Sequence, residues 1–389
     1  MTLYSERISN LSESITVAIT ALAKELKAQG KDVLGFSAGE PDFDTPDVIK
    51  KAAIDAINEG FTKYTAVDGI TELKDAIIGK LKRDNNLEYT PSQVLVSNGA
   101  KHSLFNIFQA LIDSGDEVII PSPYWVTYPE LVKYSGGSVV EIETNDASGF
   151  KITPEQLKAA MTSNTKMLIL TTPSNPTGSV YSKEELEGLA EVLKGTDVIV
   201  VSDEMYEKLV YDGEFTSAAA ISKDMFDRTI TVNGLSKSVA MTGWRFGYLA
   251  SPNDQLVKKM KGLQSQSTSN INSITQKAAI VALEGAADDD IEMMRKAFKE
   301  RRDRAVELFN AVDGLSVIKP HGAFYLFVNI SNVSNDSMTF CKELLEEKGI
   351  AVVPGLGFGS EGYFRFSFAT DIKSIEEGIA RIADFVSKK

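Results

Sequence analysis

The sequence predicts an α/β protein with a mostly parallel sheet in a large domain and a smaller α+β domain. From about residue 94 to 250, short apolar runs alternate with stretches whose apolar residues recur every three or four positions. The runs are nearly continuous, which is typical of strands covered on both faces. After about residue 290 the pattern changes to a long charged helix and a few strands, which indicates a second unit.

Seven apolar runs are the expected strands of the large sheet. They occupy residues 93–99, 116–123, 138–144, 166–173, 197–204, 228–234 and 245–251. Helical patterns lie between several of them, as at 101–115 and 182–195. Because the carboxyl ends of parallel strands meet at one edge, the residues directly after each run are the candidates for a site.

The C-terminal part has a different order of elements. A charged helix, two strands and a final helix are expected over 290–312, 322–330, 362–369 and 374–389. No linker rich in proline or serine interrupts the chain, so the long helix is the expected boundary. We therefore predict a large domain over 46–290 and a small domain that joins the N-terminal arm, 1–45, to 291–389.

Composition limits the classes of function. The 389 residues are 43% hydrophobic and 24% charged, as in ordinary globular proteins. The net charge of −13 argues against a nucleic-acid partner. The single cysteine, Cys341, lies in a helical pattern and is expected to be buried in a protein of a reducing compartment.

No segment is expected to carry the chain into or across a membrane. The N-terminus lacks the basic and apolar regions of a signal peptide, and no apolar run reaches the length of a span. We expect a cytoplasmic protein. The two histidines, His102 and His321, lack the spacing of metal ligands, so no metal site is predicted.

Polar residues of four kinds follow the expected strands. A glycine turn at 99–101 opens a helix, Asn175 precedes a proline, Asp203 ends a strand with Tyr206 just beyond, and Lys237 follows the next strand. Each has an ordinary alternative, such as a turn or a helix cap. Together they would place an amide, a carboxylate, a phenol and an amine at one edge of the sheet.

Pyridoxal phosphate is a cofactor that uses this set of groups. Lys237 would form a Schiff base with its aldehyde, and Asp203 would keep its pyridine nitrogen protonated. Asn175 and Tyr206 would donate to its ring hydroxyl. The residues expected at its phosphate are Gly99, Ala100, Lys101, Ser236 and Arg245.

Longer motifs carry a family resemblance. "GLSKSVAMTGWRFGY" around Lys237 resembles the lysine motif of class I pyridoxal-phosphate aminotransferases, and "AGEPDFDTP", "PSNPTG" and "SDEMYE" resemble their other motifs. The match runs in order along nearly the whole chain. "PYWVTYP" and "SQSTSN" make it most similar to the bacterial aspartate aminotransferase subgroup. The resemblance implies the PLP-dependent transferase fold of type I.

The resemblance also implies roles for individual residues. Lys237 would act with Asp203 and Tyr206 in catalysis and would move the proton at the substrate's α-carbon. Trp125 would stack on the cofactor ring and, with Asn175, border the substrate. The residues that it adds are Arg365 at the α-carboxylate, Gly39 where the backbone approaches the substrate, and Tyr64 at the phosphate of a neighbouring subunit. The last implies a homodimer with shared active sites.

The implied reaction is reversible amino transfer between L-aspartate and 2-oxoglutarate, giving oxaloacetate and L-glutamate. The segment 263–273 lacks the arginine that grips the distal carboxylate in animal-type enzymes. Lys101 and Thr16 match positions that the bacterial subgroup uses instead, although a solvated lysine and a helix cap are the alternatives. We therefore expect aspartate and glutamate as the best donors, with looser selectivity than an arginine fork gives.

Other functions remain open on the same scaffold. A broader aminotransferase acting on prephenate or aromatic amino acids is the first alternative, and a C–S lyase is a weaker one. A nicotinamide-dependent dehydrogenase is disfavoured, because the glycine-rich stretch 354–359 precedes a strand-like segment and lacks the following helix of a dinucleotide-binding loop.

Overall fold

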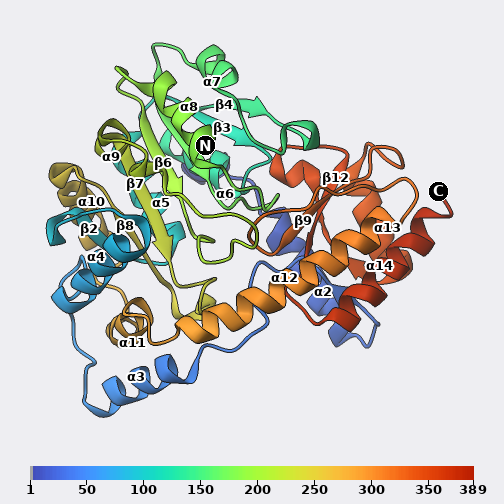
Figure 1. Cartoon of the computed structure of the whole chain (residues 1–389), viewed down its shortest axis with the longest axis horizontal. Coiled ribbons are helices and arrows are strands. Elements are labelled where there is room, and N and C mark those ends of the chain that lie inside the picture. Colours follow the sequence, from blue (N-terminus) through green and yellow to red (C-terminus); the bar gives the residue numbers. More distant parts are fainter. Residues whose placement is uncertain (1–2) are drawn as a thin grey trace.

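The computed structural model describes residues 3–389. Residues 1 and 2, which the predicted small domain includes, lie outside the described residues. A seven-stranded sheet crosses the larger part of the molecule (Figure 1). In sheet order its strands are β2 (Val94–Asn98), β8 (Phe246–Ala250), β7 (Thr229–Gly234), β6 (Ile199–Asp203), β5 (Thr165–Thr171), β3 (Glu117–Ser122) and β4 (Ser138–Glu143). Strand β8 is antiparallel to both neighbours and the other pairs are parallel, which confirms the predicted mostly parallel sheet.

Helices cover the sheet on both faces because its buried strands alternate their side chains between two cores. On β3, Val118 and Ile120 pack with three helices, whereas Ile119 between them packs on the opposite face. The first face carries α5 (Ala100–Leu111), α6 (Thr127–Ser135) and α10 (Asp254–Ser267). The second carries α7 (Pro154–Ala160), α8 (Lys183–Leu193) and α9 (Lys223–Arg228).

A third apolar cluster closes the β2 end of the sheet. Val94 and Val96 of β2 and Tyr248 of β8 pack with residues of three more helices. These helices are α3 (Asp47–Asn58), α4 (Thr71–Asn85) and α11 (Ser273–Leu283). Short 3-10 turns complete the connections and occupy Pro91–Gln93, Asp146–Ser148, Ala218–Ala220, Thr242–Trp244 and Gly355–Phe358.

The smaller part is an α+β unit built on an aromatic core. Its antiparallel sheet has the order β11 (Val353–Pro354), β12 (Tyr363–Ser367) and β9 (Tyr325–Asn329). Helices α12 (Asp288–Asn310), α13 (Ser337–Lys348) and α14 (Ile372–Val386) pack around it through residues such as Phe309, Phe340 and Phe385. Cys341 of α13 is buried, as predicted. Figure 1 shows α12 running from the large sheet to this unit.

The N-terminal arm lies against the C-terminal unit. It contains α1 (Glu6–Ser9), α2 (Ile15–Ala28) and β1 (Leu34–Gly35), and β1 pairs in parallel with β10 (Ile350–Ala351). Ala23 and Val33 of the arm share an apolar cluster with Leu345 and Ala351. The domain boundaries at 45/46 and 290/291 stay predictions. Within residues 3–389, no helix is long and apolar enough to cross a membrane.

Candidate active site

A cavity of about 330 Å³ lies at the carboxyl edge of the large sheet, where the sheet meets the smaller unit. Twelve of the residues singled out from the sequence line it: Thr16, Gly39, Ala100, Lys101, Trp125, Asn175, Asp203, Tyr206, Ser236, Lys237, Arg245 and Arg365. They come from segments up to 349 positions apart (365 minus 16). The large sheet therefore brings most of the predicted site together.

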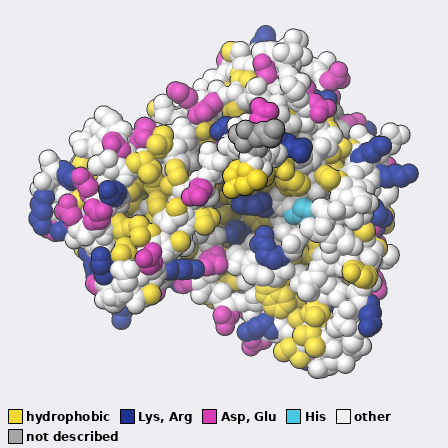
Figure 2. All heavy atoms as spheres, turned by 180° about the vertical axis from the view of Figure 1, so that it is seen from behind, with side chains coloured by type: hydrophobic (Ala, Val, Ile, Leu, Met, Phe, Trp, Pro, Cys, Tyr) yellow, Lys and Arg dark blue, Asp and Glu magenta, His cyan; other side chains and the backbone are white. Residues whose placement is uncertain are grey.

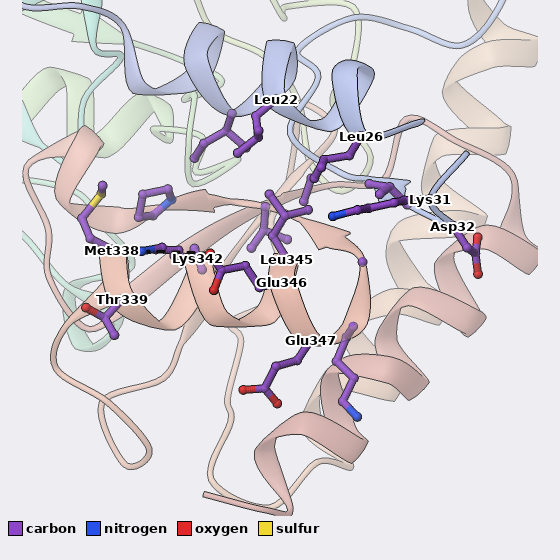
Figure 3. Close-up of a pocket in the computed structure, with 18 residues that line it drawn as sticks. Leu22, Leu26, Lys31, Asp32, Met338, Thr339, Lys342, Leu345, Glu346 and Glu347 are labelled. Carbon is purple, nitrogen blue, oxygen red and sulfur yellow. Dashed lines mark ion pairs between the residues drawn. The ribbon is translucent and has the colours of Figure 1, made fainter. Parts of the chain in front are cut away.

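A larger hollow, of about 720 Å³, lies between α2 and α13 (Figure 3). Leu22 and Leu26 of α2 point toward Leu345 of α13, and the charged side chains drawn lie around them. Its walls carry none of the twelve predicted residues named above. Volume is a poorer guide here than convergent polar groups, so the smaller cavity is the candidate site.

Asp203 forms an anionic point in the cavity wall. It ends β6, beside Thr171 at the end of β5, and it is 5% exposed. Burial raises the pKa of its carboxyl, while hydrogen bonds from the Tyr128 hydroxyl (2.8 Å) and the Met205 N–H (3.3 Å) stabilise the ionised form. A cation placed against this carboxylate would be held strongly, because little water competes for it.

Lys237 supplies the amine of the site. Its ammonium donates to the backbone carbonyl of Gly39 and lies 5.9 Å from the ring centroids of Tyr206 and Phe324. Burial, and secondarily the positive charge of Arg365, lowers the pKa of Lys237 to about 8. Near neutral pH an amine with this pKa has a far larger neutral fraction than an ordinary lysine, and the neutral form is the one that acts as a nucleophile or general base.

Arg365 is a buried cation, 2% exposed, that lies on the middle strand of the small sheet. It donates to Asn175 Oδ1 (2.9 Å) and to the carbonyl of Ser37 (2.7 Å), and its guanidinium carbon lies 4.4 Å from the ring centroid of Tyr325. Among the described residues, its Nε has no hydrogen-bond partner. Within residues 3–389, no carboxylate forms an ion pair with it, so the site retains a buried positive charge suited to an anionic ligand.

The start of α5 is suited to bind a second anion. Gly99 caps this helix with φ of +83°, a conformation that glycine adopts without strain. A Cβ at Gly99 would lie 2.5 Å from Nη2 of Arg245, so the guanidinium packs directly over the turn. The first backbone N–H groups of a helix have no intrahelical acceptor and bind anions well. Arg245 adds a full charge to them.

Lys101 and Trp125 form one wall of the cavity. The Lys101 ammonium lies 4.8 Å from the centroid of the Trp125 ring, and burial followed by the charge of Arg245 lowers the pKa of this lysine. In the described part of the chain it has no carboxylate partner. Figure 2 shows Lys and Arg side chains gathered in and around a central hollow on one face, although the whole chain has a net charge of −13.

Two of the predicted residues lie outside the cavity wall. Gly99 shapes the helix start just described, and Tyr64 is 91% exposed. Sequence reasoning missed Tyr128, which fixes Asp203, and Tyr325, whose hydroxyl lies 2.8 Å from that of Tyr206. Tyr128 lies one helical turn after Trp125 in a motif quoted above, which could have indicated it. Tyr325 lies in an ordinary apolar strand and gave no signal.

Five further residues line the cavity without having been predicted as site residues: Tyr128, Thr171, Met205, Thr242 and Tyr325. No three His, Cys, Asp or Glu side chains between residues 3 and 389 are arranged as a metal site. Among the described residues, the site therefore presents one buried carboxylate, two lysines of lowered pKa, Lys101 and Lys237, and two arginines, Arg245 and Arg365, that have no carboxylate partner. This fold and this set of groups are typical of an α/β enzyme that acts on an anionic ligand with a lysine amine.

Comparison with known proteins gives the family. The family model for aminotransferase class I and II matches residues 31–382. An aspartate aminotransferase of Bacillus subtilis (strain 168) is 50% identical over 390 residues, covering 99% of both chains. An aspartate/prephenate aminotransferase of Nitrosomonas europaea is 46% identical over 396 residues, covering 98% of this chain and 99% of that one.

Solved structures of aminotransferases are similar to this chain over its whole length. The aspartate aminotransferase of Thermus thermophilus with maleate has a TM-score of 0.95 at 44% identity, covering 99% of this chain and all of the other. The enzyme from Rhizobium meliloti gives a TM-score of 0.95 at 43% identity, covering 100% and 99%. The chain belongs to the class I and II aminotransferases, and the predicted family, enzyme class and fold are confirmed.

Proposed function

We propose that this aminotransferase moves an amino group reversibly between L-aspartate and 2-oxoglutarate, giving oxaloacetate and L-glutamate. The observation that carries the proposal is Arg365, which is buried in the same cavity as the amine of Lys237 and has no carboxylate partner within residues 3–389. An arginine fork is suited to hold a substrate carboxylate next to that amine. Support for a dicarboxylate comes from the relatives, several of which are named aspartate aminotransferase.

Pyridoxal phosphate fits the groups that the cavity presents. The buried Asp203 carboxylate suits its pyridine nitrogen, Lys237 its aldehyde, and Asn175 and Tyr206 its ring hydroxyl. Trp125 offers a ring face for stacking. The phosphate would be held by Ser236, Arg245 and the turn formed by Gly99, Ala100 and Lys101. Gly39 allows its backbone to lie close to the Tyr325 hydroxyl, since a Cβ at this position would lie 2.9 Å from that oxygen.

Three side chains of this protein have separate roles in the proposed reaction. When bound, the cofactor supplies an electron sink that makes the hydrogen on the substrate's α-carbon acidic. Arg365 orients the α-carboxylate, so the α-carbon faces Lys237. The Lys237 amine removes and returns the α-proton, and its lowered pKa suits both directions near neutral pH. Asp203 would keep the pyridine nitrogen of the cofactor protonated, and this positive charge would draw electrons away from the substrate's α-carbon.

The lowered pKa of Lys237 predicts how cofactor attachment depends on pH. Because only the neutral amine attacks an aldehyde, the attachment rate of cofactor-free protein should rise about tenfold per pH unit and level off near pH 8. Stopped-flow absorbance between pH 6 and 10 measures it. In Arg365→Gln the plateau should move to higher pH, because the lost positive charge no longer disfavours the ammonium. A wild-type rate that keeps rising to pH 10 would contradict the lowered pKa.

The distal carboxylate of aspartate would meet Lys101 and Thr16. Both line the cavity, and Thr16 lies in the first turn of α2, where Ser14 holds the cap position. Lys101 contributes a point charge against the Trp125 face. An ammonium lacks the fork geometry of arginine, so we expect neutral amino acids to react measurably, though less well than aspartate and glutamate.

Lys101→Ala tests this assignment. The variant should lose roughly 1–3 kcal/mol of kcat/KM for aspartate, the scale of a hydrogen bond to a charged group. A neutral donor such as alanine should be nearly unaffected, because it has no distal carboxylate. Steady-state kinetics with both donors gives the comparison. Equal losses for the two would assign Lys101 to the cofactor or to the fold.

A panel of amino donors against 2-oxoglutarate and oxaloacetate tests the proposed substrate pair. The proposal requires the largest kcat/KM values for aspartate and glutamate. A broader enzyme that also acts on prephenate is the second candidate, because several relatives are named aspartate/prephenate aminotransferase. A higher kcat/KM with prephenate than with 2-oxoglutarate as acceptor would favour it.

We also propose a cytoplasmic homodimer with shared active sites. Tyr64 is 91% exposed on this chain, outside the cavity, and would meet the phosphate bound by the second subunit. Sedimentation equilibrium tests the assembly. Mixing the Tyr64→Phe and Lys237→Ala proteins tests the sharing. If the sites are shared, one site of a hybrid dimer lacks both the Tyr64 hydroxyl and the Lys237 amine, and its other site retains both groups. Fractionation of source cells tests the location.

A further inference from the structure

The turn that follows Lys237 has an unusual backbone. Ala240 has φ of +51° and Arg245 has φ of +58°, so two non-glycine residues within six positions adopt the left-handed conformation. This region is unfavourable for residues with a Cβ and persists where surrounding contacts determine it. Arg245 ends this turn, so the contacts that fix the turn also fix the start of its side chain.

One threonine makes two of these contacts. The hydroxyl of Thr45, which is buried, donates to the carbonyl of Ala240 at 2.8 Å and accepts from the indole Nε1 of Trp244 at 3.0 Å. It therefore binds both the first left-handed residue and the residue directly before Arg245. Glu40 of the same segment accepts from Thr242 Oγ1 at 3.2 Å, which adds a third link between segment 40–45 and the turn.

The turn formed by residues 240–245 also positions the Arg245 guanidinium. Its Nη1 donates to the carbonyl of Thr242 at 2.8 Å, and its Nη2 packs over Gly99 at the start of α5. Within the described residues, no carboxylate holds this guanidinium in place. The orientation of the Arg245 guanidinium toward the start of α5 thus depends on the backbone of the turn, and the hydrogen bonds of Thr45 stabilise that backbone.

We infer that Thr45 is a positioning residue for the anion site formed by Arg245 and the start of α5. It acts through the turn and does not line the cavity. The inference rests on the proposed function, in which this site takes the phosphate of pyridoxal phosphate. Loss of the Thr45 hydroxyl should weaken the hold on the phosphate and leave the hold on the ring unchanged.

The test compares two ligands that differ only in the phosphate. Thr45→Val, which keeps the shape and removes the hydroxyl, should raise the Kd of pyridoxal phosphate about tenfold, the scale of one hydrogen bond with its partner left unsatisfied. The Kd of pyridoxal should stay within about twofold. Thr45→Ser restores the hydroxyl and should restore the wild-type Kd. Equilibrium dialysis with cofactor-free protein gives the Kd of both ligands for the wild type, Thr45→Val and Thr45→Ser, and inorganic phosphate should compete less well in Thr45→Val.

Two further variants keep the outcome interpretable. Thr229→Val is the matched control, because the buried Thr229 hydroxyl has no hydrogen-bond partner in the described part of the chain, so neither Kd should change. Trp244→Phe removes the indole donor from the other side of the contact and should repeat the selective loss if Thr45→Val does not fold. Equal weakening of both ligands, or no change in either, overturns the inference. Failure of the wild-type protein to bind pyridoxal phosphate would instead overturn the proposed function.

Discussion

Replacing Lys237 with alanine should abolish transamination almost completely. The same amine would attach the cofactor and move the α-proton, so one substitution removes two functions. We expect kcat to fall by at least about 10⁴-fold, the upper end of what one positioned base contributes. Rapid-quench measurement of a single half-reaction with aspartate would report the chemical step directly.

Covalent attachment separates this role from a structural one. Borohydride reduction of the wild-type holoenzyme should fix the cofactor to the peptide that contains Lys237, and the alanine variant should bind the cofactor without attachment. Lys183→Ala, at an exposed lysine at the start of α8, is the matched control and should behave as wild type. Labelling of any other lysine in the wild-type protein would refute the assignment.

The second large effect is expected at Asp203. Asp203→Ala removes the only carboxylate among the described residues that line the cavity, and with it the group that would keep the pyridine nitrogen protonated. We expect a loss of about 3–4 kcal/mol in the chemical step, the scale found when one preorganised electrostatic group is removed. The loss should appear in kcat, because substrate binding relies on Arg365.

A graded variant checks the physical reason. Tyr128→Phe leaves the carboxylate in place and removes one hydrogen bond that stabilises its ionised form. Its effect should therefore be smaller, about 1 kcal/mol, the scale of a single hydrogen bond. Near-normal turnover in Asp203→Ala would exclude the proposed role. An equal loss in both variants would mean that the Tyr128 contact, and not the charge of Asp203, controls the step.

The sequence alone determined the alternation of strands and helices and the residues that end each strand. Continuous apolar runs that alternate with helical patterns favour strands buried between two layers of helices, so the mostly parallel sheet is predicted from hydrophobicity and period. Asp203 and Lys237 follow from the same rule, because parallel strands place their carboxyl ends on one edge. The family resemblance added Arg365 and Gly39, which no periodicity marks.

Only the tertiary structure decided which side chains contact one another and how burial and neighbouring charges shift their pKa values. Arg365 meets Asn175 across 190 positions, and Thr45 meets Ala240 across 195. The lowered pKa of Lys237 arises from burial and from the charge of Arg365, neither of which a motif specifies. Tyr325 reaches the site because Met205 and Tyr206, which follow β6 of the large sheet, pack into the aromatic core of the smaller unit. Such contacts depend on how two separate cores are oriented, and local sequence encodes each core better than the junction between them.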